Sequence, residues 1–278
     1  MLIIIPINGL INRLRFIISS KILADYMNIP LFIFWKKQKN ICMCDYKDIF
    51  EDNSDLWNYI PLNIKNEFEN KYGVDLEQCP LFYNEINSIS YLRGQHHGEQ
   101  RYIENILNSK TSIKVITGGG NFYVPELKNK FDIMKSNLYN KIKFNNYIVS
   151  NKYIIPDETL GVHLRYTDLN KINDNLHDKV LLSVDNLVTL FIINNILIIG
   201  DNINEKNRLS DNLRLKYPNI NIIINNKVLT NRNNTKDLQD AMIDWLALTV
   251  CKYLIYFKNS SFSYESSIFN LKKKVIAI

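Results

Sequence analysis

The residues best suited to chemistry in this sequence stand together in the segment Gly161–Asp168. This segment ends an apolar run with an imidazole, a guanidinium, a hydroxyl and a carboxylate in succession. Strand alternation places its apolar side chains on one face and His163 and Arg165 on the other. Because α/β sheets bind ligands at the carboxyl ends of their strands, and Arg can fork onto a phosphate, the segment favours an anion site. The alternative is a strand edge with a surface ion pair between Arg165 and Asp168, and the segment alone leaves both interpretations open.

Two later apolar runs also end in polar clusters. Gly200-Asp201-Asn202 follows the run Leu197–Ile199, and Ser260-Ser261-Phe262-Ser263 follows the run Tyr253–Phe257. Hydroxyls at the start of a helix, beside its free backbone N–H groups, favour phosphate binding. The alternative is an ordinary serine N-cap, which accounts for one serine better than for three.

Asp244 lies inside the apolar helical run Ala241–Leu248. A carboxylate in such a stretch needs a polar partner if it is buried, and a ligand amide or base would serve. The alternative places Asp244 on an exposed helix face beside Asp240.

The elements that must position these residues alternate between strand and helix patterns after residue 158. This alternation predicts a small doubly wound parallel sheet. The expected strands are Leu160–Arg165, Ile196–Ile199, Ile220–Ile224, Tyr253–Phe257 and Val275–Ile278, and the expected helices are near Ser183–Ile193, Asn204–Lys216, Asp237–Thr249 and Ser263–Asn270.

The first half of the chain begins with a second α/β pattern. A buried strand at Leu2–Ile5 leads through a loop at Gly9 into a helix that Asn28-Ile29-Pro30 ends, and a strand follows at Leu31–Trp35. Further along we expect a strand at Ile113–Thr117, a turn or close approach at Gly118–Gly120, and a helix from Pro125 to Tyr139. The stretch 36–87 reads as loops and short helices around a site.

The polar, irregular stretch Asn145–Glu158 marks the expected domain boundary. The sequence therefore predicts an α/β fold with two Rossmann-like domains, 1–150 and 151–278, on either side of a cleft.

Composition narrows the class of protein. Hydrophobic residues make up 46% and charged residues 22% of the 278 residues, which is typical of a folded globular chain. The net charge of +6 suits an anionic small ligand, and without a long Lys/Arg run we expect no nucleic-acid partner. No glycine-rich dinucleotide motif follows any expected strand, which disfavours a nicotinamide enzyme.

We expect neither a metal site nor a disulfide framework. Cys42 and Cys44 have no matching second pair, and His96 and His97 are adjacent, so their side chains point apart; a surface loop is favoured there. No apolar stretch is long enough for a membrane span or a signal peptide, so we expect a cytoplasmic protein with reduced thiols.

Four of these motifs occur in one order: Gly9-Leu10-x-Asn12-Arg13-Leu14-Arg15, the Gly161–Asp168 segment, Asp244–Leu248, and Tyr253-Leu254-Ile255 followed by the serine cluster. The series resembles the fucosyltransferase superfamily that contains the nodulation-type and core α1,6-fucosyltransferases and the protein O-fucosyltransferases. It is dense in the first ~35 residues and from Leu160 onward.

The resemblance implies a GT-B fold and an inverting, metal-independent transfer of fucose from GDP-fucose to a hydroxyl of a glycan or glycoconjugate, with no cofactor. It implies that Arg165 grips the β-phosphate of the donor. Arg165, the helix start at the serine cluster and Arg13 would then stabilise the negative charge that grows on the departing diphosphate. Asp168 matches the motif's carboxylate and, with Glu99, is a candidate general base. The implied donor-binding residues are Asn12, Arg13, His163, Asp201, Asp244, Ser260, Ser261, Phe262 and Ser263.

The chain also departs from the family pattern. Tyr166 stands in place of a second arginine, Leu169 in place of a basic residue, Asn202 in place of a second aspartate, and Ile11 in place of a glycine. Two alternatives therefore stay open: transfer of another sugar from a different nucleotide donor, and an inactive protein of the same fold that binds a nucleotide sugar or a glycan.

Overall fold

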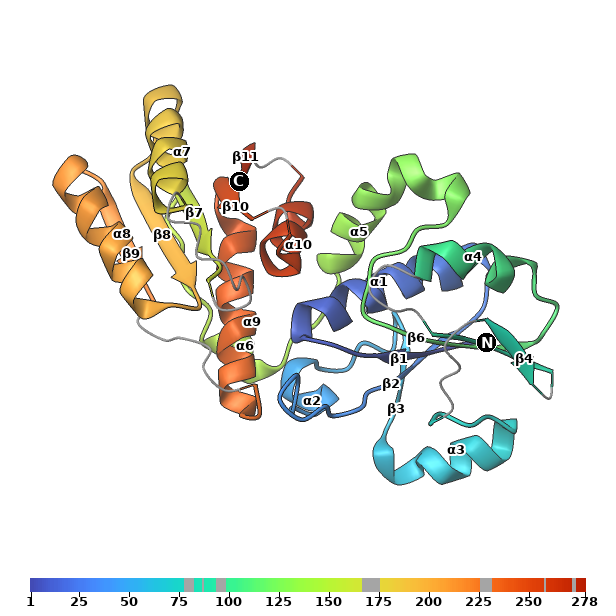
Figure 1. Cartoon of the computed structure of the whole chain (residues 1–278). Helices are drawn as coiled ribbons and strands as arrows, with labels where there is room; N and C mark the ends of the chain where they lie inside the picture. The colour runs from blue at the N-terminus through green and yellow to red at the C-terminus, as the bar shows by residue number, and fades with distance from the viewer. Residues whose placement is uncertain are drawn as a thin grey trace. The chain divides into compact units, whose positions relative to one another are not determined.

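The chain divides into two compact α/β units (Figure 1). The first comprises Met1–Asn145 with Arg232–Thr235, and the second comprises Asn146–Asn231 with Lys236–Ile278. The computed structural model describes residues 1–77, 83–86, 88–93, 99–166, 176–225, 232–257, 259–271 and 274–278. Within these ranges no helix combines the length and the apolar character that crossing a membrane requires.

The first unit has a six-stranded sheet in the order β3-β2-β1-β6-β5-β4. All neighbouring strands are parallel except β4, which runs antiparallel to β5. The strands are β1 (Leu2–Pro6), β2 (Leu31–Phe34), β3 (Asn58–Ile60), β4 (Asn84–Ile86), β5 (Ile89–Arg93) and β6 (Ile113–Gly118). The helices are α1 (Leu10–Tyr26), α2 (Tyr46–Ile49), α3 (Lys65–Tyr72), α4 (Glu99–Asn108) and α5 (Phe131–Tyr139), with 3₁₀ turns η1 (Leu62–Ile64) and η2 (Pro125–Lys130).

Strand β1 is the centre of this sheet. Its five residues are all buried, and it pairs with β2 on one side and β6 on the other. This confirms the continuous apolar run as a parallel strand, since such strands are covered on both faces. The end of α1 also follows the prediction: Asn28 adopts a positive φ of 51° and the Ile29 N–H reaches back to the Ala24 carbonyl at 3.0 Å.

The described part of the stretch 36–87 holds short helices and loops, as expected, but also strands β3 and β4, which the sequence analysis missed, as it missed β5 just beyond this stretch. Strand β5 pairs in register with β6, which begins twenty residues further along the chain. Local patterning does not reveal such a strand, because its partner supplies the hydrogen bonds and the burial.

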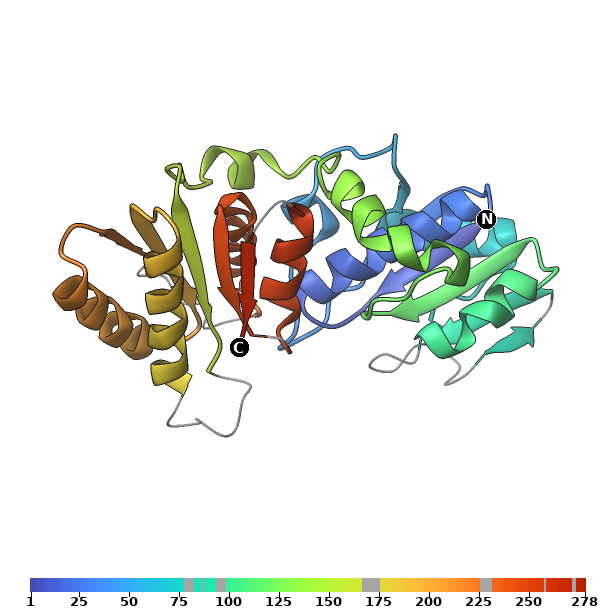
Figure 2. The ribbon, with the colours of Figure 1, turned by 90° about the horizontal axis from the view of Figure 1, so that it is seen from above.

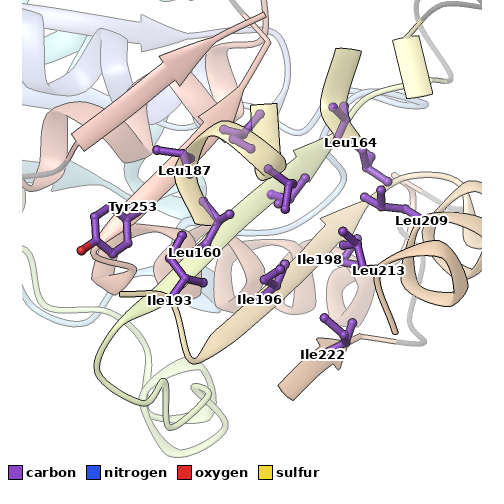
Figure 3. Packing of buried hydrophobic residues seen from close by; sticks show 14 of the residues in the cluster. Leu160, Leu164, Leu187, Ile193, Ile196, Ile198, Leu209, Leu213, Ile222 and Tyr253 are labelled. Carbon is purple, nitrogen blue, oxygen red and sulfur yellow. The ribbon is translucent and has the colours of Figure 1, made fainter. Parts of the chain in front are cut away.

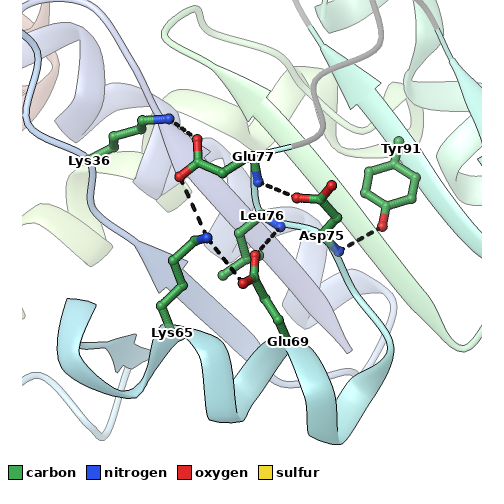
Figure 4. A network of polar contacts seen from close by, with 7 residues as sticks. All are labelled: Lys36, Lys65, Glu69, Asp75, Leu76, Glu77 and Tyr91. Carbon is green, nitrogen blue, oxygen red and sulfur yellow. Dashed lines mark hydrogen bonds and ion pairs between the residues drawn. The ribbon is translucent and has the colours of Figure 1, made fainter.

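A polar network fixes the chain after α3 (Figure 4). Glu69 of α3 accepts a hydrogen bond from the Leu76 N–H at 2.8 Å, and the Tyr91 hydroxyl lies 3.2 Å from the Asp75 N–H. Glu77 pairs with Lys36 and lies 3.7 Å from Lys65. The contacts join α3, β5 and the end of β2 around one turn of chain.

The second unit has a five-stranded parallel sheet in the order β11-β10-β7-β8-β9. The strands are β7 (Thr159–Leu164), β8 (Asn195–Gly200), β9 (Asn221–Ile224), β10 (Tyr253–Tyr256) and β11 (Lys274–Ala277), and the helices are α6 (Asn146–Ser150), α7 (Leu176–Leu190), α8 (Ile203–Lys216), α9 (Thr235–Val250) and α10 (Ser261–Phe269). Every strand and helix predicted for this half of the chain is present.

Helices cover both faces of this sheet (Figure 2). On one face, buried side chains of α7 and α8 pack on those of β7, β8 and β10; they include Leu160, Leu164, Leu187, Ile198, Leu209 and Leu213 (Figure 3). On the other face α9 lies close to β7: a Cβ at Gly161 of β7 would stand 3.1 Å from Cδ2 of Leu248 in α9. Because helices cover both faces of the sheet, polar side chains gather at the edge formed by the carboxyl ends of its strands.

Candidate functional site

The candidate site lies in the second unit, at the carboxyl edge of its sheet. The chain runs outward from β7 through β8 to β9 and then returns to the other side of β7 with β10. Open α/β sheets bind ligands where the strand order reverses in this way. The segments that follow β7, β8 and β10 hold the residues discussed next.

His163 occupies the next-to-last position of β7 and is only 4% exposed. Its ring stacks on that of Phe262, with centroids 5.1 Å apart and an interplanar angle of 21°. Burial, with a smaller contribution from the Arg165 charge, lowers the pKa of His163 to about 3, so the imidazole is neutral at neutral pH. Its Nδ1 atom is buried without a hydrogen-bond partner in the described part of the chain. A buried ring nitrogen of this kind is suited to a ligand that supplies the missing partner.

Arg165 follows β7 directly and pairs with a residue that follows β8. Its guanidinium lies 3.5 Å from Asp201 Oδ2, while Asp201 Oδ1 accepts the Tyr166 N–H at 2.8 Å. Asp201 therefore fixes both the guanidinium and the backbone beside it. The Arg165 side chain is 24% exposed, so an incoming anion can reach this cation.

The serine cluster forms the start of α10. Ser260 is the N-cap residue, with an extended backbone and no side-chain capping hydrogen bond. The first N–H groups of a helix have no partner within it and favour a negative charge. Ser263 is wholly buried, and its hydroxyl has no hydrogen-bond partner among the described residues. Phe262, between them, joins this helix start to His163.

Asp244 of α9 is half-buried and carries its own set of partners. Asn225, just after β9, donates to Asp244 Oδ1 at 2.8 Å, and the Tyr153 hydroxyl donates to the same oxygen at 3.2 Å. The buried ammonium of Lys206 donates to the Asn225 carbonyl. Burial raises the pKa of Asp244 to about 6, against the hydrogen bonds and the Lys206 charge, so the carboxylate is mostly ionised at neutral pH. Sequence reasoning missed Asn225, Lys206 and Tyr153; the only signal was that a buried aspartate needs partners.

Asn12 and Arg13 lie in the first unit, near the start of α1. The Arg13 guanidinium is fully buried and donates to the Asn8 carbonyl at 2.9 Å, the Lys36 carbonyl at 2.7 Å and Gln38 Oε1 at 2.9 Å. It also lies 4.6 Å from the centroid of the Trp35 ring. Burial lowers the pKa of Arg13. These contacts hold the loop after β1, whose residue Asn8 has a φ of 70°.

Gly119 explains part of the glycine run after β6. A Cβ at this position would lie 2.6 Å from the Ile7 carbonyl oxygen and 2.7 Å from Asn8 Nδ2. The loops after β1 and β6 therefore meet at Gly119, and its carbonyl accepts a hydrogen bond from Arg15 Nε at 3.0 Å. Asn12 is half-buried in the first turn of α1, and its Nδ2 lies 3.9 Å from the place of a Cβ at Gly9.

Several predicted residues lie outside the described residues: Asp168 with its neighbours, and the histidine pair 96–97, while the side chain of Glu99 is likewise not described. Among the described residues no group of three or more His, Cys, Asp or Glu side chains is arranged to hold a metal ion. Cys42, Cys44 and Cys251 are buried and form no disulfide with one another or with another described residue.

Comparison of the sequence with protein-family models and with curated proteins gives no match. Solved structures do match. A mutant of Arabidopsis thaliana FUT1 in complex with GDP has a TM-score of 0.67 and 15% identity, covering 99% of this chain and 69% of that one. NodZ, an α-1,6-fucosyltransferase soaked with GDP-fucose, has a TM-score of 0.65 and 13% identity, covering 96% and 92%; a NodZ structure from Bradyrhizobium also matches. POFUT1 in complex with GDP has a TM-score of 0.54 and 8% identity, covering 100% and 98%.

The protein thus has the fold of these fucosyltransferases. Its two α/β units, each built on a largely parallel sheet, correspond to the GT-B-like architecture that the sequence predicts.

Proposed function

We propose that this protein is a glycosyltransferase that transfers fucose from GDP-fucose to a hydroxyl group of a glycan or glycoconjugate. The observation that carries the proposal is the arrangement at the β7–β10 edge. A buried neutral His163 is stacked on the first turn of α10, beside Arg165 held by Asp201. The fold similarity to proteins solved with GDP or GDP-fucose supports the choice of donor.

In this proposal the second unit binds the donor. Arg165 and the N–H groups at the start of α10 bind the diphosphate, His163 lies near the nucleoside, and Asp244 accepts hydrogen bonds from the guanine. Asp201 holds Arg165 in place. Arg13 acts indirectly, since its guanidinium donates to groups of the protein in the loop after β1. The first unit then provides the acceptor side.

The reaction is a single displacement. The bond between the fucose anomeric carbon and the β-phosphate oxygen breaks as the acceptor oxygen attacks from the opposite face, so the configuration inverts. The diphosphate leaves with the bonding electrons. Arg165 and the start of α10 stabilise the negative charge that grows on it, as a metal ion does in metal-dependent enzymes. The acceptor's proton passes to a general base, for which Asp168 and Glu99 are the sequence candidates.

The test is calorimetric titration of the wild type and Arg165→Ala with GDP, GDP-fucose, UDP and ADP, in the presence of EDTA. We expect the guanine compounds alone to bind, and Arg165→Ala to weaken GDP binding by roughly tenfold or more, as for loss of a charge-assisted hydrogen bond. Arg214→Ala is the control, because Arg214 is an exposed arginine of α8. Equal binding by Arg165→Ala and the wild type would contradict the site.

Turnover separates the enzyme from a binding protein. GDP release from GDP-fucose with a glycan acceptor, and a product of inverted configuration by NMR, are the expected results with EDTA present. Tight GDP binding without any donor hydrolysis or transfer would favour the inactive binding protein, and binding of UDP or ADP instead would favour another donor.

A further inference from the structure

The hydrogen bonds that Asp244 accepts fall on only one of its two carboxylate oxygens. Both of its hydrogen bonds end on Oδ1, from Asn225 Nδ2 at 2.8 Å and from the Tyr153 hydroxyl at 3.2 Å. Within the described part of the chain no hydrogen bond reaches Oδ2. A carboxylate oxygen without a partner is the stronger acceptor for a ligand N–H.

Asn225 is itself held by a buried cation. Its main-chain carbonyl accepts a hydrogen bond from the Lys206 ammonium, which is fully buried in α8. Asn225 is 8% exposed and follows the last residue of β9. The amide that meets Asp244 is therefore fixed by a strand end, by burial and by a charge-assisted hydrogen bond to its backbone.

We propose that Asn225 is a positioning residue for Asp244: its amide, anchored by Lys206, holds Oδ1 and keeps the carboxylate ionised, so that Oδ2 is offered to a ligand that presents an N–H group. The inference rests on the proposed donor site, in which that N–H belongs to the guanine edge. An adenine edge offers an acceptor at the corresponding ring nitrogen and would face Oδ2 less favourably.

The charged groups around Asp244 give the proposal a pH signature. Lys206 and the hydrogen bonds from Asn225 and Tyr153 favour the ionised carboxylate, while burial and Asp240, one turn earlier in α9, disfavour it. Removing the Asn225 amide takes away a hydrogen bond to the anion only, so the carboxyl must titrate at a higher pH than in the wild type.

The experiment measures GDP-fucose binding by calorimetry from pH 5.5 to 8.5. This donor suits the purpose because its diphosphate is doubly esterified and lacks the terminal phosphate group that titrates near pH 6. In the wild type, binding should weaken as the pH falls through about 6. In Asn225→Ala the midpoint should rise by about one pH unit, which makes binding about fivefold weaker than wild type at pH 6 and about equal at pH 8.5.

Asn221→Ala is the matched control, because Asn221 begins the same strand and its amide donates to Asn195 Oδ1 instead. Its midpoint should equal that of the wild type. An Asn225→Ala midpoint equal to the wild-type value overturns the inference. So does a loss of affinity that is the same at every pH, since general structural damage would produce that result.

Two further measurements test the inference even if Asn225→Ala does not fold or the protein does not bind GDP-fucose. If Asn225→Ala does not fold, Tyr153→Phe removes the second hydrogen bond to Oδ1 and should raise the midpoint by a smaller amount; an unchanged midpoint overturns the inference. If the wild type does not bind GDP-fucose at pH 8.5, the proposed function fails. The carboxyl ¹³C resonance of Asp244 then still reports whether Asn225→Ala raises its pKa.

Discussion

At the residue scale, His163 combines burial, aromatic stacking and a ring nitrogen that has no hydrogen-bond partner among the described residues. Burial of this histidine destabilises the folded protein at low pH. The unfolded chain protonates the imidazole at its ordinary pKa, whereas in the folded chain the pKa of His163 is only about 3. Between these two values the unfolded state binds more protons, so the free energy of unfolding falls as the pH falls. Above pH 6.5 the contribution is constant.

We therefore predict that His163→Phe flattens the acid side of the stability profile. Between pH 4 and 6 its free energy of unfolding should change less steeply than that of the wild type, by up to about 1.4 kcal/mol per pH unit. The variant keeps an aromatic ring beside Phe262. Urea unfolding at a series of pH values measures the slope.

Asp244 has the opposite effect on the pH dependence of stability, because its pKa is raised to about 6 in the folded protein. This effect is the same in the wild type and in His163→Phe, so it does not alter the difference between their slopes. Phe257→Leu is the control, because Phe257 contacts the same imidazole and does not titrate. A slope in His163→Phe identical to that of the wild type would contradict a neutral, buried His163.

At the scale of the element, two helices of the second unit start in different ways. The Asn202 side chain caps α8 by accepting the Glu205 N–H at 3.2 Å. Ser260 stands at the same position of α10 and makes no side-chain capping hydrogen bond. The start of α8 is completed by its own cap, whereas in the proposed function the start of α10 binds the phosphates of the donor.

The two alanine variants should therefore have opposite effects. Asn202→Ala should lower the free energy of unfolding by about 1 kcal/mol, the usual cost of losing an N-cap, with little change in GDP affinity. Ser260→Ala should leave stability nearly unchanged and weaken GDP binding by a few-fold, as a hydroxyl lost from a phosphate site does. Unfolding curves and calorimetry on both variants make the comparison, and a reversed pattern would contradict a phosphate site at α10.

At the scale of the whole molecule, each unit has its own sheet and its own buried core. A ligand bound by one unit stabilises the native state by mass action, by about 2.7 kcal/mol at one hundred times its dissociation constant. The amides that gain protection first are those of the elements in contact with it.

Hydrogen exchange with and without saturating GDP should therefore show added protection in β7, β10 and the start of α10. Strands β2 and β5 of the first unit should change less. UDP at the same concentration is the control and should alter neither set. Protection that rises in β2 and β5 while β7 and β10 stay unchanged would place the nucleotide on the first unit.

The sequence by itself determined the parallel sheet of the second unit and the residue types at its carboxyl edge. Apolar runs of strand length that alternate with amphipathic helices have few other ways to bury their surface. The sequence also indicated His163, Arg165, Asp201 and the serine cluster, because each follows a strand that local patterning reveals.

Only the tertiary structure decided which partners these residues meet. Arg165 pairs with Asp201, which follows a different strand. Asp244 meets Asn225 and Tyr153 from distant parts of the chain, and Arg13 donates to the loop after β1. Strand β5 likewise became apparent only beside β6. The physical reason is the same in each case. Burial and hydrogen bonding between residues far apart in sequence depend on how the chain folds, and local sequence patterns do not predict these long-range contacts.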